Sequence, residues 1–177
     1  MVRPRNLGNS EGMNLITKAR YGALAGAAGT AALNTTAYID MAVRGRQPSE
    51  LPEKVVRKLA EMAGLSMLSK PPEQLNDHEK HQRAGVAALI GYVDGIGAGM
   101  FFGLLRPSMR GIPPVLCGIL LGAFTMALSE GTAAALGQTN PAEWPPDAWV
   151  SDIVPRCIYG WVACAAFDAM VNANDRR

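Results

Sequence analysis

Two aspartates stand in otherwise apolar stretches of the chain, where a carboxylate is the group best suited to chemistry. Asp94 is the single charged residue between Arg83 and Arg106, and Asp168 follows a charge-free run that begins after Arg156. Inside a membrane, each ionised acid costs roughly 2.5 to 3.5 kcal/mol, so it requires a partner, water or a proton. Both carboxyls are predicted to lie near mid-membrane, where a close pair could carry a proton or bind a cation.

A structural role for these two aspartates is the alternative. Each carboxyl could be protonated, or hydrogen-bonded by hydroxyl and amide groups of neighbouring helices, and so lock the helices together. The side chains available for such hydrogen bonds are those of Thr30, Asn34, Tyr92, Thr125 and Ser129.

Four further charged residues are predicted to share one rim of the membrane. Successive spans run in opposite directions, so the end of one span and the beginning of the next lie on the same side. The order of the residues therefore predicts an ion pair between Glu130 and Arg156, with Asp40 and Arg44 nearby. The alternative is that these side chains reach the lipid headgroups separately.

Neither histidine nor cysteine spacing predicts a metal or cofactor site. His78 and His81 could share a helical face, but charges surround them and no third histidine or cysteine is close in sequence. We interpret them as part of a solvated face. Cys117, Cys157 and Cys164 fall in apolar stretches and are expected to be small packing residues. No nucleophile elbow or phosphate-binding glycine loop is present in the sequence, so we expect no catalysis.

The distribution of charge divides the chain into long apolar segments. Hydrophobic residues make up 49% and charged residues 18%, and the charges gather in the intervening stretches. About 20 apolar residues in a helix cross the ~30 Å hydrocarbon core. We predict an all-α polytopic membrane protein, a single domain over residues 1–177, with four spans at about 19–43, 84–105, 112–136 and 153–173.

Glycines recur at every fourth position in the second predicted span. Glycines with this spacing form a groove without side chains, against which the backbone of a second helix can pack. The groove could receive the first span or a helix of a partner. The predicted packing residues are Gly22, Gly26, Gly91, Gly95, Gly99, Gly103, Gly118 and Gly122. The predicted intramembrane polar residues are Asp94, Asp168, Glu130, Arg156 and Asn34.

The long connection after the first span contains a predicted amphipathic helix over residues 52–64. Pro52 suits the first turn of a helix, and Val55, Val56 and Leu59 then repeat at helical spacing. Charged residues occupy the opposite face: Lys54, Arg57, Lys58 and Glu61. Such a helix could lie in the headgroup region or dock on a partner.

Charge also bears on orientation and on the kind of partner. Four spans place both termini on the same side of the membrane, and that side is rich in arginine. The loop over 137–152, on the other side, has no lysine or arginine. The positive-inside rule therefore places both termini in the cytoplasm, with the protein in the inner (plasma) membrane. A net charge of only +2 leaves no electrostatic footprint for nucleic acid.

Two segments and the second span resemble a known group of proteins. The segments are Tyr21-Gly-Ala-Leu-Ala-Gly-Ala-Ala-Gly-Thr and Pro48-Ser-Glu-Leu-Pro-Glu-Lys-Val-Val. With the glycine-rich second span they resemble small polytopic membrane proteins of the YagU-like kind, from the first span to the last. Members of that group lack an assigned activity, so the resemblance implies no catalytic residue. The Ala/Arg/Gly-rich composition looks actinobacterial and resembles accessory subunits of mycobacterial lipid-import machinery of the Mce type.

These features favour a non-catalytic accessory or regulatory subunit of a larger inner-membrane assembly. The Mce resemblance implies a lipid transporter complex, with other integral membrane proteins and the lipid bilayer as partners. The alternative is a small proton- or ion-coupled transporter or channel that uses Asp94 and Asp168. A lipid-modifying enzyme that uses Glu130, Arg156 or the two histidines is the least supported class.

Overall fold

The structure is a computed structural model, and it describes residues 13–109 and 111–174. Every regular element in this described part is helical, which confirms the all-α prediction for these residues. Three helical segments are long and apolar enough to cross a membrane: Asp77–Met109, Pro114–Ala135 and Pro146–Asn174. They correspond to the second, third and fourth predicted spans. The first predicted span is also a long helix, but its many glycines, alanines and threonines make it less apolar than the other three.

Short connections join most of the long helices. The exception is the segment between Arg44 and Asp77, which contains two further short helices. The α-helices are α1 Leu15–Arg44, α2 Leu51–Met62, α3 Ser66–Ser69, α4 Asp77–Leu105, α5 Pro114–Ala135 and α6 Pro146–Asn174. Three short 3-10 turns lie between them: η2 Pro72–Gln74, η3 Arg106–Met109 and η4 Pro141–Glu143.

Local signals at the helix ends explain several of these bounds. The Asn14 side chain accepts a hydrogen bond from the Thr17 N–H at 2.8 Å, and so caps the start of α1. Gly45, at φ 65°, ends the helix in the left-handed conformation that glycine adopts readily. At the start of α4, Asn76 and Glu79 each bond to the other's backbone N–H, which forms a capping box.

Glycine contacts hold α1 against α4. A Cβ atom added to Gly26 would lie 2.5 Å from the Gly95 carbonyl oxygen, and one on Gly103 would lie 2.5 Å from that of Lys18. Gly22 and Gly99 meet in the same contact. Because no side chain fits between these backbones, the zipper of the second predicted span receives α1 of the same chain.

A second glycine contact joins α5 to α6. A Cβ atom on Gly122 would lie 2.6 Å from the Arg156 carbonyl oxygen, and Gly118 is covered by Trp161. Gly160 of α6 presses against the backbone of Gly118 in return. The two pairs, α1 with α4 and α5 with α6, are joined by the contact between α1 and α6.

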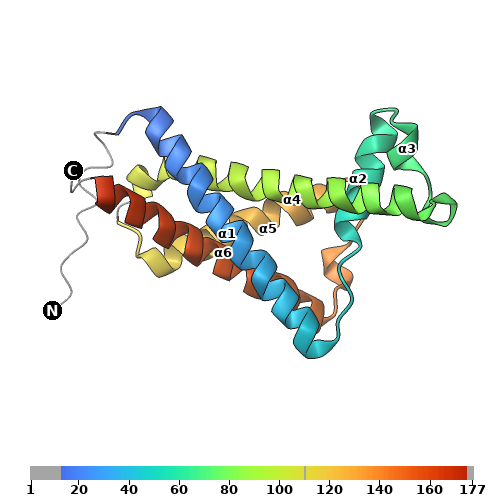
Figure 1. Cartoon of the computed structure of the whole chain (residues 1–177). Helices are drawn as coiled ribbons and strands as arrows, with labels where there is room; N and C mark the ends of the chain where they lie inside the picture. The colour runs from blue at the N-terminus through green and yellow to red at the C-terminus, as the bar shows by residue number, and fades with distance from the viewer. Residues whose placement is uncertain (1–12, 110, 175–177) are drawn as a thin grey trace.

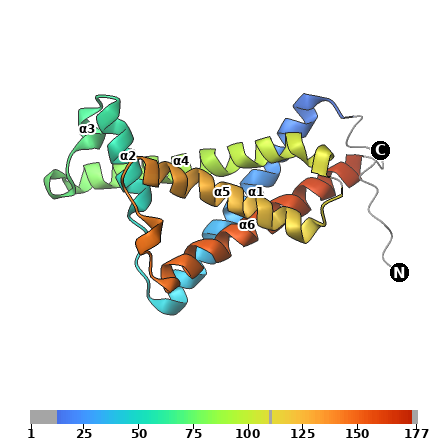
Figure 2. The same cartoon turned by 180° about the vertical axis from the view of Figure 1, so that it is seen from behind.

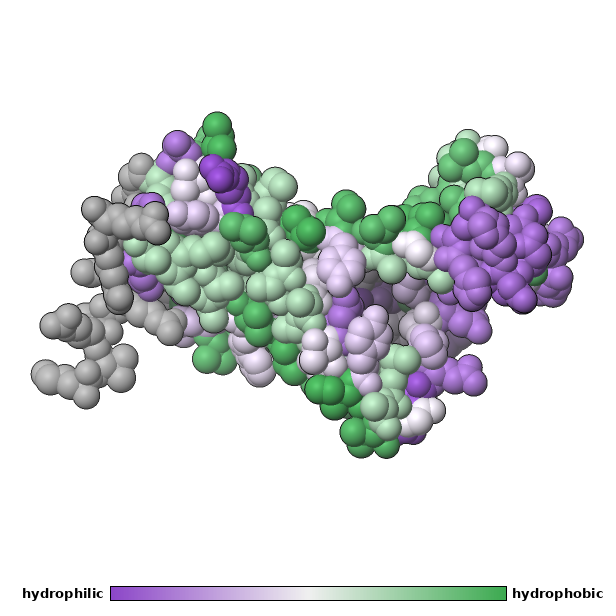
Figure 3. All heavy atoms as spheres, viewed as in Figure 1, coloured by the Kyte–Doolittle hydropathy of each residue, from purple (hydrophilic) through white to green (hydrophobic). Residues whose placement is uncertain are grey.

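The long helices cross near one end and spread apart toward the other (Figures 1 and 2). The first arm is the N-terminal half of α4, with α2 and α3 at its tip. The second arm is the C-terminal half of α1 beside the N-terminal half of α6. We call the space between them the opening; the surface is hollowed there, as Figure 3 shows.

Helix α2 occupies most of the predicted amphipathic segment and packs against α3 and α4 of the same chain. Val56 and Ala60 are buried, each 3% exposed. Arg57 also donates a hydrogen bond to the Gln138 side chain at 3.4 Å, which links α2 to the segment that follows α5. Part of the apolar face of α2 is thus used inside the molecule.

Candidate functional site

The core-facing stripe of α4 has an uncovered window in its middle. We define the stripe by residues that follow one another at spacings of three and four and so share one helix face: Arg83, Ala87, Gly91, Asp94, Ala98 and Phe102. The four outer members are between 2% and 6% exposed. Gly91 and Asp94 are exposed, and a Cβ atom added to Gly91 would meet nothing within 4 Å. The protein covers this stripe at both ends and leaves it open where the arms diverge.

The point of divergence lies next to Asp94. The hydroxyl of Tyr159 in α6 donates a hydrogen bond to the Gly95 carbonyl oxygen at 2.6 Å. The Thr30 side chain of α1 packs against the same glycine. Helix α5 also runs beside α4 (Figure 2), but Gly91 and Asp94 stay exposed, so Asp94 stands at the inner end of the opening.

Asp94 forms no hydrogen bond and no ion pair among the described residues. The opposite charge that acts on it is that of Arg156, which lies one turn before Tyr159 on α6. An exposed carboxylate in an apolar helix is costly unless a donor or a cation reaches it. A hydrogen-bond donor from another molecule would therefore stabilise the Asp94 carboxylate in the window.

Arg156 is already engaged by other groups. Its Nη2 atom pairs with Glu130 Oε1 at 2.8 Å, and its Nε atom pairs with Asp152 Oδ2 at 2.9 Å. Its Nη1 atom donates to the Thr125 carbonyl oxygen at 3.1 Å. The ion pair expected between Glu130 and Arg156 is thus present. Asp152 is a further partner that was not predicted, although it precedes Arg156 by four residues and shares its helix face.

The charges around the opening do not balance. Three carboxyl groups, those of Asp94, Glu130 and Asp152, share the field of one guanidinium group, that of Arg156. The second oxygen of Glu130, Oε2, is buried and has no hydrogen-bond partner among residues 13–109 and 111–174. The inner end of the opening, around Arg156, therefore holds more acidic than basic side chains, and a positively charged group is favoured there.

The outer rim carries the predicted Asp40 and Arg44 pair. Arg44 Nε lies 2.5 Å from Asp40 Oδ1, and Arg46 Nε lies 3.1 Å from Asp40 Oδ2. Arg44 also hydrogen-bonds to Ser151, the neighbour of Asp152, so this pair joins α1 to α6 close to the Arg156 cluster. Asn34 lies part-buried on α1 between this rim and Thr30.

The predicted proximity of Asp94 and Asp168 is wrong. Asp168 forms a two-pronged ion pair with Arg106, with Nη2 to Oδ2 at 3.0 Å and Nε to Oδ1 at 3.2 Å. Both side chains are almost fully buried, 1% and 4% exposed. Because Arg106 follows Asp94 by twelve residues of helix at 1.5 Å each, the two aspartates are separated by about 18 Å along α4.

The error has a geometric cause. The prediction places Arg156 at the rim, and Asp168 therefore twelve residues deeper in the membrane. Helix α6 begins at Pro146, so Arg156 is already well inside the helix and Asp168 lies near the opposite end. The predicted hydroxyl partners also differ: Thr30 and Thr125 donate to carbonyl oxygens of their own helices, those of Gly26 and Gly122.

Other predicted residues lie away from the opening. His78 and His81 are exposed at the tip of the first arm. No group of three His, Cys, Asp or Glu side chains within residues 13–109 and 111–174 is placed to hold a metal ion.

Of the eight predicted packing glycines, seven meet another helix, whereas Gly91 has open space.

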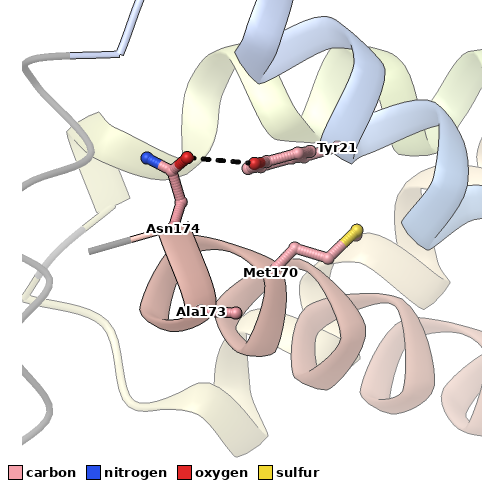
Figure 4. A pocket seen from close by; sticks show the side chains of 4 residues that line it. All are labelled: Tyr21, Met170, Ala173 and Asn174. Atoms are coloured by element: carbon pink, nitrogen blue, oxygen red, sulfur yellow. Dashed lines mark hydrogen bonds between the residues drawn. The ribbon is translucent and has the colours of Figure 1, made fainter. Parts of the chain in front are cut away.

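A shallow cavity of about 170 Å³ lies between the start of α1 and the end of α6 (Figure 4). Tyr21, Met170, Ala173 and Asn174 line it, and the Tyr21 hydroxyl donates to Asn174 Oδ1 at 3.4 Å. The lining contains no charged group. It offers less chemistry than the opening does.

No family model matches the chain, and no curated protein or solved structure matches it. The resemblances to YagU-like proteins and to Mce accessory subunits stay predictions. The functional argument therefore rests on the opening and its charges.

Proposed function

We propose that the chain is a non-catalytic accessory or regulatory subunit of a larger inner-membrane assembly, and that a helix of a partner enters the opening. The observation that supports this proposal is the uncovered window on α4. Gly91 provides a surface without a side chain, and Asp94 provides a carboxylate to which no residue of the described part donates a hydrogen bond. A small residue beside a polar one is the combination that favours helix association in lipid.

A transmembrane helix suits the window better than lipid does. Acyl chains cannot hydrogen-bond to a carboxylate, whereas a neighbouring helix can bring a donor to it. The acidic balance of Asp94, Glu130 and Asp152 against Arg156 favours a lysine or arginine on that helix.

The partner is expected to be a different membrane protein. In a second copy of this chain, Arg106 and Arg156 are already paired with carboxylates, and Arg83 donates to the Lys70 carbonyl oxygen. A second copy would therefore bring no free cation from those positions to Asp94. An integral membrane protein with its own basic residue does so, and the sequence resemblance points to a lipid transporter complex of the Mce type.

We also propose how the helices are placed in the membrane. Helix α1 packs along both α4 and α6, so it crosses the bilayer with them as a fourth span. Its outward side chains, among them Leu24, Tyr38 and Ile39, are exposed and apolar or aromatic, as lipid contact requires. The amphipathic α2 then lies at the bilayer surface at the tip of the first arm, and the positive-inside rule places both termini in the cytoplasm.

Purification from native membranes in mild detergent tests the subunit role. We expect the native protein to migrate with a companion in constant ratio by size and mass spectrometry. Gly91→Leu, which fills the window, is expected to release the companion. The matched control is Gly97→Leu, since Gly97 also has open space but lies off the stripe. A native protein that is always monomeric, or a companion that both variants retain equally, would refute the proposal.

The transporter alternative loses one of its two carboxyls, because Asp168 is held by Arg106. A transport or channel activity would therefore depend on the Asp94 carboxyl group alone. If the purified protein conducts protons or ions in proteoliposomes, an Asp94→Asn variant with unchanged flux would exclude this alternative.

A further inference from the structure

Tyr159 of α6 reaches two other helices at the inner end of the opening. Its side chain is 1% exposed, and its hydroxyl donates a hydrogen bond to the Gly95 carbonyl oxygen of α4 at 2.6 Å. Its ring lies against Gly29 of α1, where an added Cβ atom would be 2.8 Å from the ring atom Cδ2. One side chain therefore touches both neighbouring long helices at the point where the two arms separate.

Glycines at two positions make this contact possible. A methyl group at Gly29 would occupy the space of the tyrosine ring, so the missing side chain admits the ring between α1 and α6. A Cβ atom on Gly95 would collide with the Thr30 hydroxyl, so α1 also comes close to α4 at this level. Three helices thus meet around the side chain of one tyrosine.

The hydroxyl bond joins α4 to α6 and is not needed to complete α4. Gly95 lies inside α4, so its carbonyl oxygen also accepts the backbone N–H four residues later, and a carbonyl oxygen has two lone pairs. The pair of Arg106 and Asp168 joins the same two segments eleven residues farther along, about 16 Å away. Two contacts that are this far apart fix the angle between two helices, whereas one contact would let them pivot.

The bond also acts next to the uncovered carboxylate. Asp94 directly precedes Gly95, so a hydroxyl held on the Gly95 carbonyl oxygen restrains the rotation of α4 about its axis at this level. The direction in which Asp94 points is restrained with it.

We propose that Tyr159 is a positioning residue, whose bond to Gly95 sets the width of the opening and presents Asp94 to the partner helix. The second of these roles rests on the proposed function, whereas the first depends only on how α4 and α6 are joined. Without the bond, the two arms are expected to swing apart about the contact of Arg106 with Asp168.

The distance between the arms tests the first role without any partner. Spin labels are attached to cysteines introduced by His81→Cys on the first arm and Val43→Cys on the second, since both positions are exposed. The background carries Cys157→Ser, because Cys117 and Cys164 are buried and stay unlabelled. Pulsed electron resonance in lipid vesicles then gives the distribution of distances between the two labels.

Two tyrosine variants are compared with the native chain in this measurement. Tyr159→Phe keeps the ring and removes the hydroxyl, so its distribution should be broader and shifted to longer distances. Tyr21→Phe is the matched control, because it removes a hydroxyl that joins α1 to Asn174 of α6 away from the opening. Its distribution should match the native one. An unchanged distribution in Tyr159→Phe, or an equal change in both variants, overturns the proposal.

Helix binding tests the second role. A leucine-rich transmembrane peptide with a central lysine should bind Tyr159→Phe severalfold more weakly than Tyr21→Phe, although the two variants melt at similar temperatures. Equal binding by both variants would overturn the role of Tyr159 in presenting Asp94. A native chain that binds this peptide no better than Asp94→Asn does would refute the proposed function instead, and the distance measurement would still decide whether Tyr159 sets the opening.

Discussion

At the scale of single residues, the ion pairs show what side-chain spacing can and cannot predict. The Glu130 and Arg156 pair followed from the rule that adjacent helix ends share a rim, which needs no knowledge of packing angles. The Arg106 and Asp168 pair did not, because it depends on where α6 begins and how it crosses α4. Arg106 looked like a helix stop, and only the fold brings it to an aspartate 62 positions later.

The buried pair predicts a specific stability pattern. Arg106→Met removes the guanidinium group that makes two hydrogen bonds to the buried Asp168 carboxylate, and removing one partner of a buried ion pair costs about 3 to 5 kcal/mol. The thermal midpoint in detergent should therefore fall sharply. The double variant Arg106→Met with Asp168→Leu should recover much of the loss, because it buries no uncompensated charge. Equal destabilisation in the single and double variants would mean that the pair is not coupled as described.

At the scale of elements, glycine spacing predicted the packing faces of three helices. Gly22, Gly26, Gly118 and Gly122 all meet a neighbouring helix, as the spacing indicated. The spacing could not predict which helix would fill which groove, nor that the zipper of α4 would be covered only as far as Gly95. That limit is set by the crossing of α1 over α4, since crossing rods separate within a few turns.

The α1 and α4 contact predicts which glycines tolerate a side chain. A Cβ atom on Gly99 would lie 2.6 Å from the Gly22 carbonyl oxygen, so Gly99→Leu forces the helices apart. We expect loss of the compact elution profile and a stability loss on the order of 3 kcal/mol or more. Gly97→Leu, two residues away and facing open space, should elute and melt as the native protein does. Similar behaviour of both variants would contradict the described contact.

At the scale of the whole molecule, the divergence of the two arms is the feature that gives Asp94 its importance. The sequence placed Asp94 inside an apolar helix, but it could not show that the stripe around it would be uncovered. That property arises because α1 and α6 turn away from α4 beyond Tyr159, while α2 covers only the far end of the stripe. Any function that uses the opening therefore depends on helix geometry rather than on a local motif.

The most direct test of this account is the binding of a defined helix to the opening. A synthetic leucine-rich transmembrane peptide with a central lysine is incorporated with the labelled protein into lipid vesicles, and association is measured by energy transfer. We expect this peptide to bind the native chain about tenfold more tightly than the Asp94→Asn or Gly91→Leu variant, a difference of about 1.4 kcal/mol. Gly97→Leu should bind it normally, and a peptide with leucine in place of lysine should bind all of them weakly. Equal binding of the lysine peptide to the native chain and to Asp94→Asn would contradict the account.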